Sequence, residues 1–130
     1  MNGAKEDRIR VAVLGTGAIS QVVHLPILCE REDVEVVGVS DEDVHKARSI
    51  ADRFDVPRVL DDSELLAAPD VEAVVICTPN HLHERLAVEA LDRGKHVLVE
   101  RPLALDAAGA RTVLAAAEAA DRHIHVGMYH

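Results

Sequence analysis

Short apolar runs rich in Val and Ile alternate along the chain with segments of helical period. Runs that are apolar at nearly every position are typical of parallel strands covered on both faces. Parallel neighbours also need a crossover segment between them, so this alternation restricts the fold more than any other feature. The runs predict six strands, the third being the weakest, at residues 9–15, 34–40, 58–60, 71–78, 96–100 and 124–128.

The segments between these runs carry apolar residues three or four positions apart, which places them on one face of a helix. A helix after Gly17 should break or kink near residues 24–26, because Pro26 has no amide hydrogen to donate. Alternating strands and helices predict a doubly wound α/β domain, with a parallel sheet of about six strands and helices on both faces. Further helices are predicted at 44–54, 80–93 ending at Gly94, 106–120 with Asp106 as N-cap, and from residue 61 or 63 to before Pro69.

Composition excludes several classes of protein. The 130 residues, 48% of them hydrophobic, suffice for one domain with its own core, and a net charge of −9 with 2% aromatic residues disfavours a nucleic-acid partner. The chain has no apolar run of the roughly 18 residues that a membrane span needs, and its first ten residues lack the apolar stretch of a signal peptide. Cys29 and Cys77 show no disulfide or metal-binding spacing, so we expect a cytoplasmic protein with two free thiols.

A glycine-containing turn follows the first predicted strand directly and opens a helix. This context is the one in which a dinucleotide's pyrophosphate rests on the amides of a helix N-terminus. The first glycine would allow the tight turn, the second would let the backbone approach the phosphates, and Ser20 replaces the usual third glycine. Two glycines that merely end a strand are the alternative. The predicted pyrophosphate contacts are Gly15, Thr16, Gly17, Ala18 and Ile19.

An acidic residue, Asp41, ends the second predicted strand, at about the spacing from the turn expected for a carboxylate that binds the adenosine ribose. The alternative is that Asp41 is only a helix N-cap. Glu42 and Asp43 stand where a cation would be needed to neutralise a 2′-phosphate, so we expect NAD rather than NADP, although Arg48 is within reach of the same place.

Several motifs together resemble the N-terminal half of the Gfo/Idh/MocA oxidoreductases, a family that includes glucose-fructose oxidoreductase and inositol 2-dehydrogenase. The resemblance extends over the whole chain. It is carried by the glycine turn, His24 with Pro26, Asp41, Thr78-Pro79-Asn80 with His83, and KHVLVERP at 95–102.

The resemblance implies that Thr78, Pro79, Asn80 and His83 border the nicotinamide end of the coenzyme. It also implies that the strand ends around Cys77 and Glu100 form the floor of the crevice. From the residues alone, Pro79-Asn80 suits a turn and helix N-cap, and His83 suits a solvent-facing histidine in a first helical turn. Cys77 suits a small buried hydrophobic residue better than a nucleophile.

Where the family has Glu-Lys-Pro, this chain has Glu100-Arg101-Pro102. In the family the lysine hydrogen-bonds the reacting hydroxyl and assists proton transfer, so the resemblance implies catalytic places for Glu100 and Arg101. A guanidinium stays ionised at all ordinary pH values, so we expect Arg101 to position a substrate or coenzyme group rather than to transfer a proton. A simple ion pair with Glu100 or a helix carboxylate is the alternative.

The resemblance implies a substrate domain after this one, and we do not expect residues 1–130 to include it. We therefore expect residues 1–130 to be the dinucleotide-binding domain of an oxidoreductase that transfers hydride between the nicotinamide of NAD and a sugar, polyol or similar hydroxyl compound. Alone, the chain would be catalytically incomplete, its small-molecule substrate would need the missing domain, and a homo-oligomer remains open. A stand-alone NAD-sensing or regulatory module without turnover and a scaffold without nucleotide affinity are the alternatives.

The eight histidines do not predict a metal site. His123 and His125 would share the face of a strand, and His81 and His83 lie near a helix start, where side chains two positions apart diverge. Neither pair has a third ligand at a suitable spacing. We therefore expect no bound metal.

Overall fold

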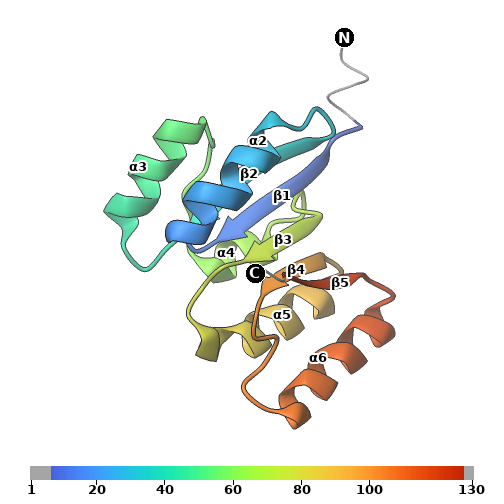
Figure 1. Cartoon of the computed structure of the whole chain (residues 1–130). Helices are drawn as coiled ribbons and strands as arrows, with labels where there is room; N and C mark the ends of the chain where they lie inside the picture. Colours follow the sequence, from blue (N-terminus) through green and yellow to red (C-terminus); the bar gives the residue numbers. More distant parts are fainter. Residues whose placement is uncertain (1–6, 128–130) are drawn as a thin grey trace.

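Five parallel strands form the centre of the fold in the computed structural model, which describes residues 7–127: β1 (Ile9–Leu14), β2 (Val34–Ser40), β3 (Ala73–Ile76), β4 (His96–Glu100) and β5 (Ile124–Gly127). Their order in the sheet is β2-β1-β3-β4-β5, so the chain builds first to one side of β1 and then to the other (Figure 1). This order confirms the predicted doubly wound sheet. The direction in which strands are added changes between β1 and β3, which makes this the switch point of the sheet. Met128, which ends the last predicted run, lies outside the described residues.

The predicted strand at 58–60 is reduced to a single bridge in which Val59 pairs with Val39 at the edge of β2. The Val39 amide donates to the Arg58 carbonyl at 3.0 Å, and the Leu60 amide donates to the Val39 carbonyl at 3.2 Å. Three residues that follow Pro57 are too few for a longer ladder. The prediction of about six strands is therefore corrected to five strands and a bridge.

Helices cover both faces of the sheet, as predicted. Alternate residues of β1 show why, because side chains along a strand point to opposite faces. Val11 and Val13 pack in one apolar cluster with Leu25, whereas Ala12 and Leu14 pack in a second cluster on the other face. The first cluster is covered by α2 (Leu25–Glu30) and α3 (Val44–Phe54), and the second by α4 (Asp62–Ala67), α5 (His83–Asp92) and α6 (Ala107–Ala120) (Figure 1).

Side-chain caps fix where several helices begin. Asp61 accepts a bond from the Glu64 amide at 2.8 Å while Glu64 accepts one from the Asp61 amide at 3.1 Å, which completes a capping box before α4. Asp106 accepts a bond from the Gly109 amide at 2.7 Å and caps α6, as predicted. Gly94, with φ of 79°, follows α5 in the left-handed conformation that glycine favours.

The helix after the glycine turn contains a π-helical turn, η1 (Ser20–His24), which runs directly into α2. Here the Leu25 amide donates to the Ser20 carbonyl five residues earlier. Pro26 follows at once and cannot donate a helical hydrogen bond, so the predicted irregularity near residues 24–26 is confirmed. His24 lies at the end of this turn and is 8% exposed.

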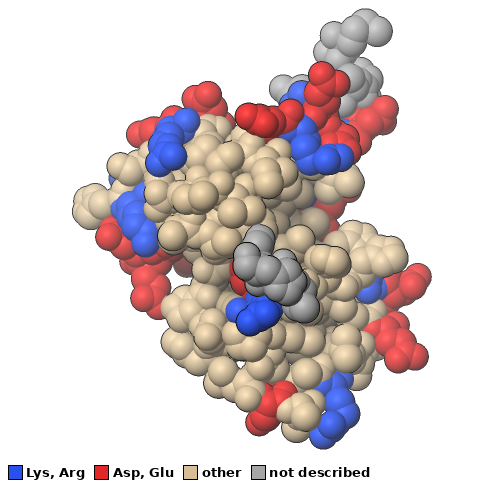
Figure 2. Space-filling view, in the orientation of Figure 1, with Lys and Arg blue, Asp and Glu red and all other residues tan. Residues whose placement is uncertain are grey.

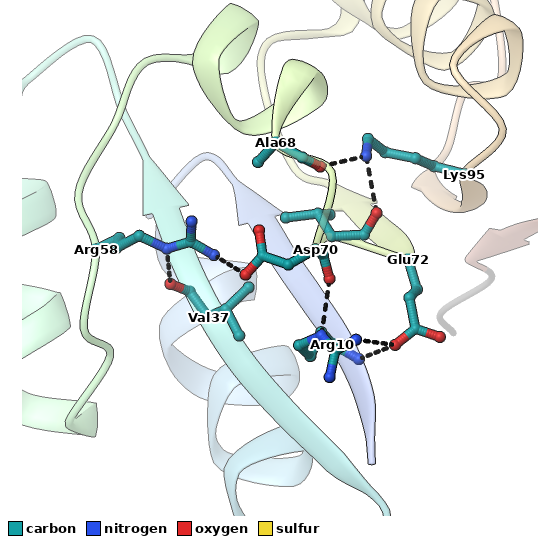
Figure 3. A network of polar contacts seen from close by, with 8 residues as sticks. Arg10, Val37, Arg58, Ala68, Asp70, Glu72 and Lys95 are labelled. Atoms are coloured by element: carbon teal, nitrogen blue, oxygen red, sulfur yellow. Dashed lines mark hydrogen bonds and ion pairs between the residues drawn. The ribbon is translucent and has the colours of Figure 1, made fainter. Parts of the chain in front are cut away.

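Lys95 is buried at the amino edge of the sheet, the side on which all the parallel strands begin. Its Nζ donates to the carbonyls of Ala68 and Val71, each at 2.8 Å (Figure 3). Ala68 is the C-cap of α4, so the ammonium satisfies a carbonyl at a helix C-terminus, where positive charge is favourable. This contact ties β4 to the loop that precedes β3.

Two arginines, Arg10 in β1 and Arg58 next to the bridge at Val59, bind the same loop. Arg58 donates to the Val37 carbonyl at 3.2 Å and to the Asp70 carboxylate at 2.7 Å. Arg10 donates to the Asp70 carbonyl at 3.0 Å and lies 3.6 Å from the Glu72 carboxylate (Figure 3). The three cations together hold the loop at 68–72 against the strands.

Charged side chains lie mostly at the periphery of the face shown in Figure 2, where basic and acidic groups are interspersed. The excess of acidic residues therefore does not form one continuous patch on this face. Among residues 7–127, no helix has the length and apolar character needed to cross a bilayer.

Candidate functional site

The carboxyl ends of β1, β2 and β3 meet at a crevice of about 400 Å³, within the usual size range of ligand pockets. Ligands of open parallel sheets bind at this edge, where the strand order reverses. The crevice brings together several predicted coenzyme residues, namely Gly15, Gly17, Asp41, Thr78 and Pro79, with Glu42, Lys46, Asp62, Cys77 and Leu82.

The glycine turn has the conformation that a phosphate-binding turn requires. Gly15 has φ of 96°, and a Cβ atom there would lie 2.6 Å from the Cys77 carbonyl oxygen. At Gly17 such an atom would meet nothing within 4 Å, so this stretch of backbone faces open space. Ser20, in the place of the usual third glycine, is fully buried and donates its hydroxyl to the Gly15 carbonyl at 2.5 Å. The serine therefore packs the turn instead of leaving it loose.

The Asp41 carboxylate is held by the glycine turn. Its Oδ2 accepts bonds from the Thr16 amide at 2.8 Å and the Thr16 hydroxyl at 2.7 Å, and its Oδ1 accepts the Asp43 amide at 2.9 Å. Lys46 Nζ lies 3.7 Å from Oδ2. Burial alone would raise the pKa of Asp41, but the Thr16 hydroxyl, the two amides and Lys46 outweigh it, so the pKa is lowered and the ionised form favoured.

Asp41 is not a helix N-cap. The N-cap of α3 is Asp43, whose carboxylate accepts a bond from the Lys46 amide at 3.1 Å. The alternative reading of Asp41 is therefore wrong, because the helix begins two residues later.

Thr78, just beyond β3, has a buried hydroxyl oxygen with no hydrogen-bond partner among residues 7–127. A buried hydroxyl without a partner is costly, so its position on the wall of the crevice points to a ligand group. The short helix η2 (Asn80–Leu82) follows, with Pro79 at its N-cap position and no side-chain cap. Asn80 is exposed, and the expectation that it caps a helix is wrong.

His83, the first residue of α5, is 1% exposed. Its Nδ1 contacts the Pro102 carbonyl at 2.7 Å and its Nε2 contacts the Thr78 carbonyl at 2.8 Å. The solvent-facing alternative for His83 is therefore wrong, because the turns that follow β3 and β4 enclose the ring. His83 therefore connects these two turns through its ring nitrogens. It does not line the crevice.

Glu100, at the end of β4, lies against His24 from the first helix, with Oε1 hydrogen-bonded to Nε2. The thiol of Cys77 is close to both groups. Burial raises the pKa of Cys77 to about 11, and the Ser20 hydroxyl offsets this only in part, so the thiol is protonated at neutral pH as expected for a non-nucleophilic cysteine. His24 was not predicted as a site residue, although it lies in the predicted irregular turn just before Pro26.

Arg101 is exposed just past β4, and its bond to Pro102 is cis. Among residues 7–127 it forms no ion pair with Glu100 or with a helix carboxylate, so the pairing alternative is not supported there. The predicted residues Thr16, Ala18, Ile19, Asn80, His83, Glu100 and Arg101 do not line the crevice itself.

Residues 9–128 match the Gfo/Idh/MocA family, described as an oxidoreductase family with an NAD-binding Rossmann fold. The chain belongs to this family. The match confirms the resemblance seen in its motifs, and the crevice at the switch point is the place where Rossmann domains bind dinucleotides. The chain is thus a nicotinamide-dinucleotide-binding domain of an oxidoreductase family.

Relatives of known sequence and structure agree with this assignment. An uncharacterized oxidoreductase from Rhizobium meliloti is 44% identical over 101 residues, which are 77% of this chain and 30% of that protein. D-glucoside 3-dehydrogenase from Escherichia coli is 35% identical over 104 residues, which are 79% of this chain and 30% of that protein.

The 3-ketoreductase KijD10 from Actinomadura kijaniata, solved in complex with TDP-benzene and NADP, superposes with a TM-score of 0.86 at 32% identity. The superposition covers 92% of this chain and 38% of KijD10. This member of the Gfo/Idh/MocA family therefore spans only about a third of the length of the relatives that it matches.

Proposed function

We propose that this chain binds NAD for an oxidoreductase that transfers hydride between the nicotinamide and a sugar, polyol or similar hydroxyl compound. The observation that carries the proposal is the preformed crevice, with an open backbone at Gly17 and an ionised carboxylate at Asp41. When bound, the coenzyme would supply the hydride chemistry, and the protein would supply binding and orientation.

The residues at the crevice fit a dinucleotide. The open approach to Gly17 would admit a pyrophosphate beside Ala18 and Ile19, at the first amides of the helix. Asp41 accepts three hydrogen bonds from protein groups, and a carboxylate has about four acceptor sites, which leaves capacity for a ribose hydroxyl. The buried Thr78 hydroxyl would gain a partner from the nicotinamide half.

The charges at the adenosine end favour NAD over NADP. Of the residues between 7 and 127 that line the crevice, three are acidic, Asp41, Glu42 and Asp62, and one is basic, Lys46. A 2′-phosphate placed here would meet this excess of negative charge, which like-charge repulsion disfavours. KijD10 was solved with NADP, so coenzyme choice in this family depends on local side chains such as these.

We further propose that the substrate is enclosed by residues outside this 130-residue domain, because its relatives are about three times as long as the part matched here. Glu100 and Arg101 would then face the reacting end, with Arg101 donating hydrogen bonds to a hydroxyl or carboxamide group. Asn80 would border the same end. Neither the family match nor the relatives support a sensing module without turnover.

The test is a fluorescence titration of the chain with NADH and NADPH. Asp41→Asn should weaken NADH binding by about 10- to 100-fold, corresponding to the loss of a charged hydrogen bond of about 1.5–3 kcal/mol. Its matched control is Asp43→Asn, two residues away, which should leave affinity unchanged because asparagine caps a helix as well as aspartate does. Equal effects of the two substitutions, or no binding of NADH at millimolar concentration, would contradict the proposal.

A further inference from the structure

Three potential metal ligands meet at the carboxyl edge of the sheet, from three separate elements. They are His24 at the end of η1, Cys77 just past β3 and Glu100 at the end of β4. The nitrogen, sulfur and oxygen atoms that could bind an ion all lie within 4.8 Å of one another. Histidine spacing along the sequence gives no sign of this cluster, because each ligand comes from a different element.

We propose that His24, Cys77 and Glu100 form a binding site for a divalent transition-metal ion of the zinc class. Imidazole, thiolate and carboxylate are the three ligand types that Zn²⁺ uses in proteins. The thiolate disfavours Mg²⁺ and Ca²⁺, which prefer sites made only of oxygen ligands.

The cluster is shielded as a metal site should be. The side chains of His24 and Glu100 are 10% and 12% exposed. Gly127 in β5 leaves room for the carboxylate, since a Cβ atom there would lie 2.9 Å from Glu100 Oε2. Four elements thus shape the space around these ligands.

Binding would exchange a proton for the ion. The Cys77 thiol carries a proton, because burial raises its pKa to about 11. That proton would leave to solvent as the thiolate binds the ion, and bonds from Nε2 and Oε1 to the ion would replace the hydrogen bond between His24 and Glu100. Affinity should therefore rise with pH, as expected when an ion competes with protons for its ligands.

Cys77 also lines the coenzyme crevice, so an ion bound by its thiolate would lie beside a bound coenzyme. That placement rests on the proposed function, whereas metal binding itself does not.

The test is a titration of the chelator-treated full chain with Co²⁺, followed by absorption spectroscopy. We expect one ion per chain and a thiolate-to-cobalt charge-transfer band that Zn²⁺ abolishes by competition. Cys77→Ser should remove the band, and the matched control Cys29→Ser, at the exposed thiol, should keep it. His24→Gln should weaken Co²⁺ binding by at least about tenfold, the lower end of the loss seen even for outer-shell groups.

The proposal is overturned if the unaltered chain shows no thiolate band, if the band survives Cys77→Ser, or if it disappears in Cys29→Ser. In the first case His24 and Glu100 are only a hydrogen-bonded pair. Circular dichroism of each variant shows that the fold is kept, and Cys77→Ala replaces Cys77→Ser if the latter does not fold. A separate NADH titration distinguishes failure of this site from failure of the coenzyme site.

Discussion

The two edges of the sheet use polar groups in different ways. At the amino edge, Lys95 and the two arginines are engaged with carbonyls and carboxylates of the chain itself, which fixes the loop before β3 (Figure 3). At the carboxyl edge, Thr78 keeps a buried hydroxyl without a described partner, and Asp41 keeps acceptor capacity. The first edge stabilises the fold, and the second is prepared for a ligand.

Size alone does not distinguish these edges. The amino edge has the larger hollow, about 520 Å³ and lined by residues such as Lys95, His96 and Arg122, against about 400 Å³ at the crevice. The Lys95 ammonium and the Arg122 guanidinium there are already bound to backbone carbonyls. Incomplete hydrogen bonding at the switch point is therefore a better indication of the binding site than volume.

The comparison predicts its largest effect at Lys95. Lys95→Met keeps the length of the side chain but leaves the Val71 carbonyl without its donor and the Ala68 carbonyl with only the Val71 amide, at 3.2 Å. A buried carbonyl left unpaired costs about 1–3 kcal/mol, and a lost hydrogen bond to a charged group costs about 1.5–3 kcal/mol. We therefore expect the free energy of unfolding to fall by about 2–4 kcal/mol in chemical denaturation. NADH affinity should not change.

The matched control is Lys46→Met at the carboxyl edge, where the ammonium is exposed and 3.7 Å from Asp41. Loss of an exposed ion pair should lower the free energy of unfolding by less than about 1 kcal/mol. A stability loss at Lys46 as large as that at Lys95, or an NADH affinity that falls with Lys95→Met, would contradict the prediction. Either result would show that stability and coenzyme binding do not belong to different edges.

A second prediction concerns His83, which lies at the carboxyl edge but contacts only the chain itself. His83→Leu removes the contacts to the carbonyls of Thr78 and Pro102 with little change of volume. We expect a loss of about 1–3 kcal/mol in the free energy of unfolding, together with weaker NADH binding because Thr78 lines the crevice. Thermal unfolding and NADH titration of one preparation measure both effects.

His81→Leu is the control for this substitution, since His81 is exposed two residues earlier. It should change stability by no more than about 0.5 kcal/mol. If His83→Leu lowers stability but leaves NADH affinity intact, the two turns joined by His83 do not shape the crevice.

The sequence predicted those parts of the fold that local patterns determine. The buried strands, the glycine turn and the cap at Asp106 follow from residues close together in the chain. The extent of pairing at 58–60 depends on the neighbouring strand and on Pro57, and a short apolar run does not reveal it. The predicted number of strands was therefore too high.

At the site, contacts between distant segments were the part that sequence patterns missed. Burial of His83 depends on a turn that arrives from the end of β4, and Glu100 meets His24 only once β1 and β4 lie in one sheet. Lys95 is buried although lysine is among the most exposed residue types, because two carbonyls satisfy its charge. The spacing of residues along the sequence does not reveal these contacts.

The smallest expected effect is a change in acid stability that depends on Asp41. Because the fold lowers the pKa of Asp41, its stabilising contribution is complete above the unfolded value of about 3.9 and is lost as pH falls below it toward the lower folded value. Denaturation of the unaltered chain should therefore show a steeper loss of stability below about pH 4 than denaturation of Asp41→Asn. Parallel acid profiles would mean that the Thr16 contacts do not favour the ionised carboxylate, and the ribose would then lack the charged acceptor that separates this edge from the other.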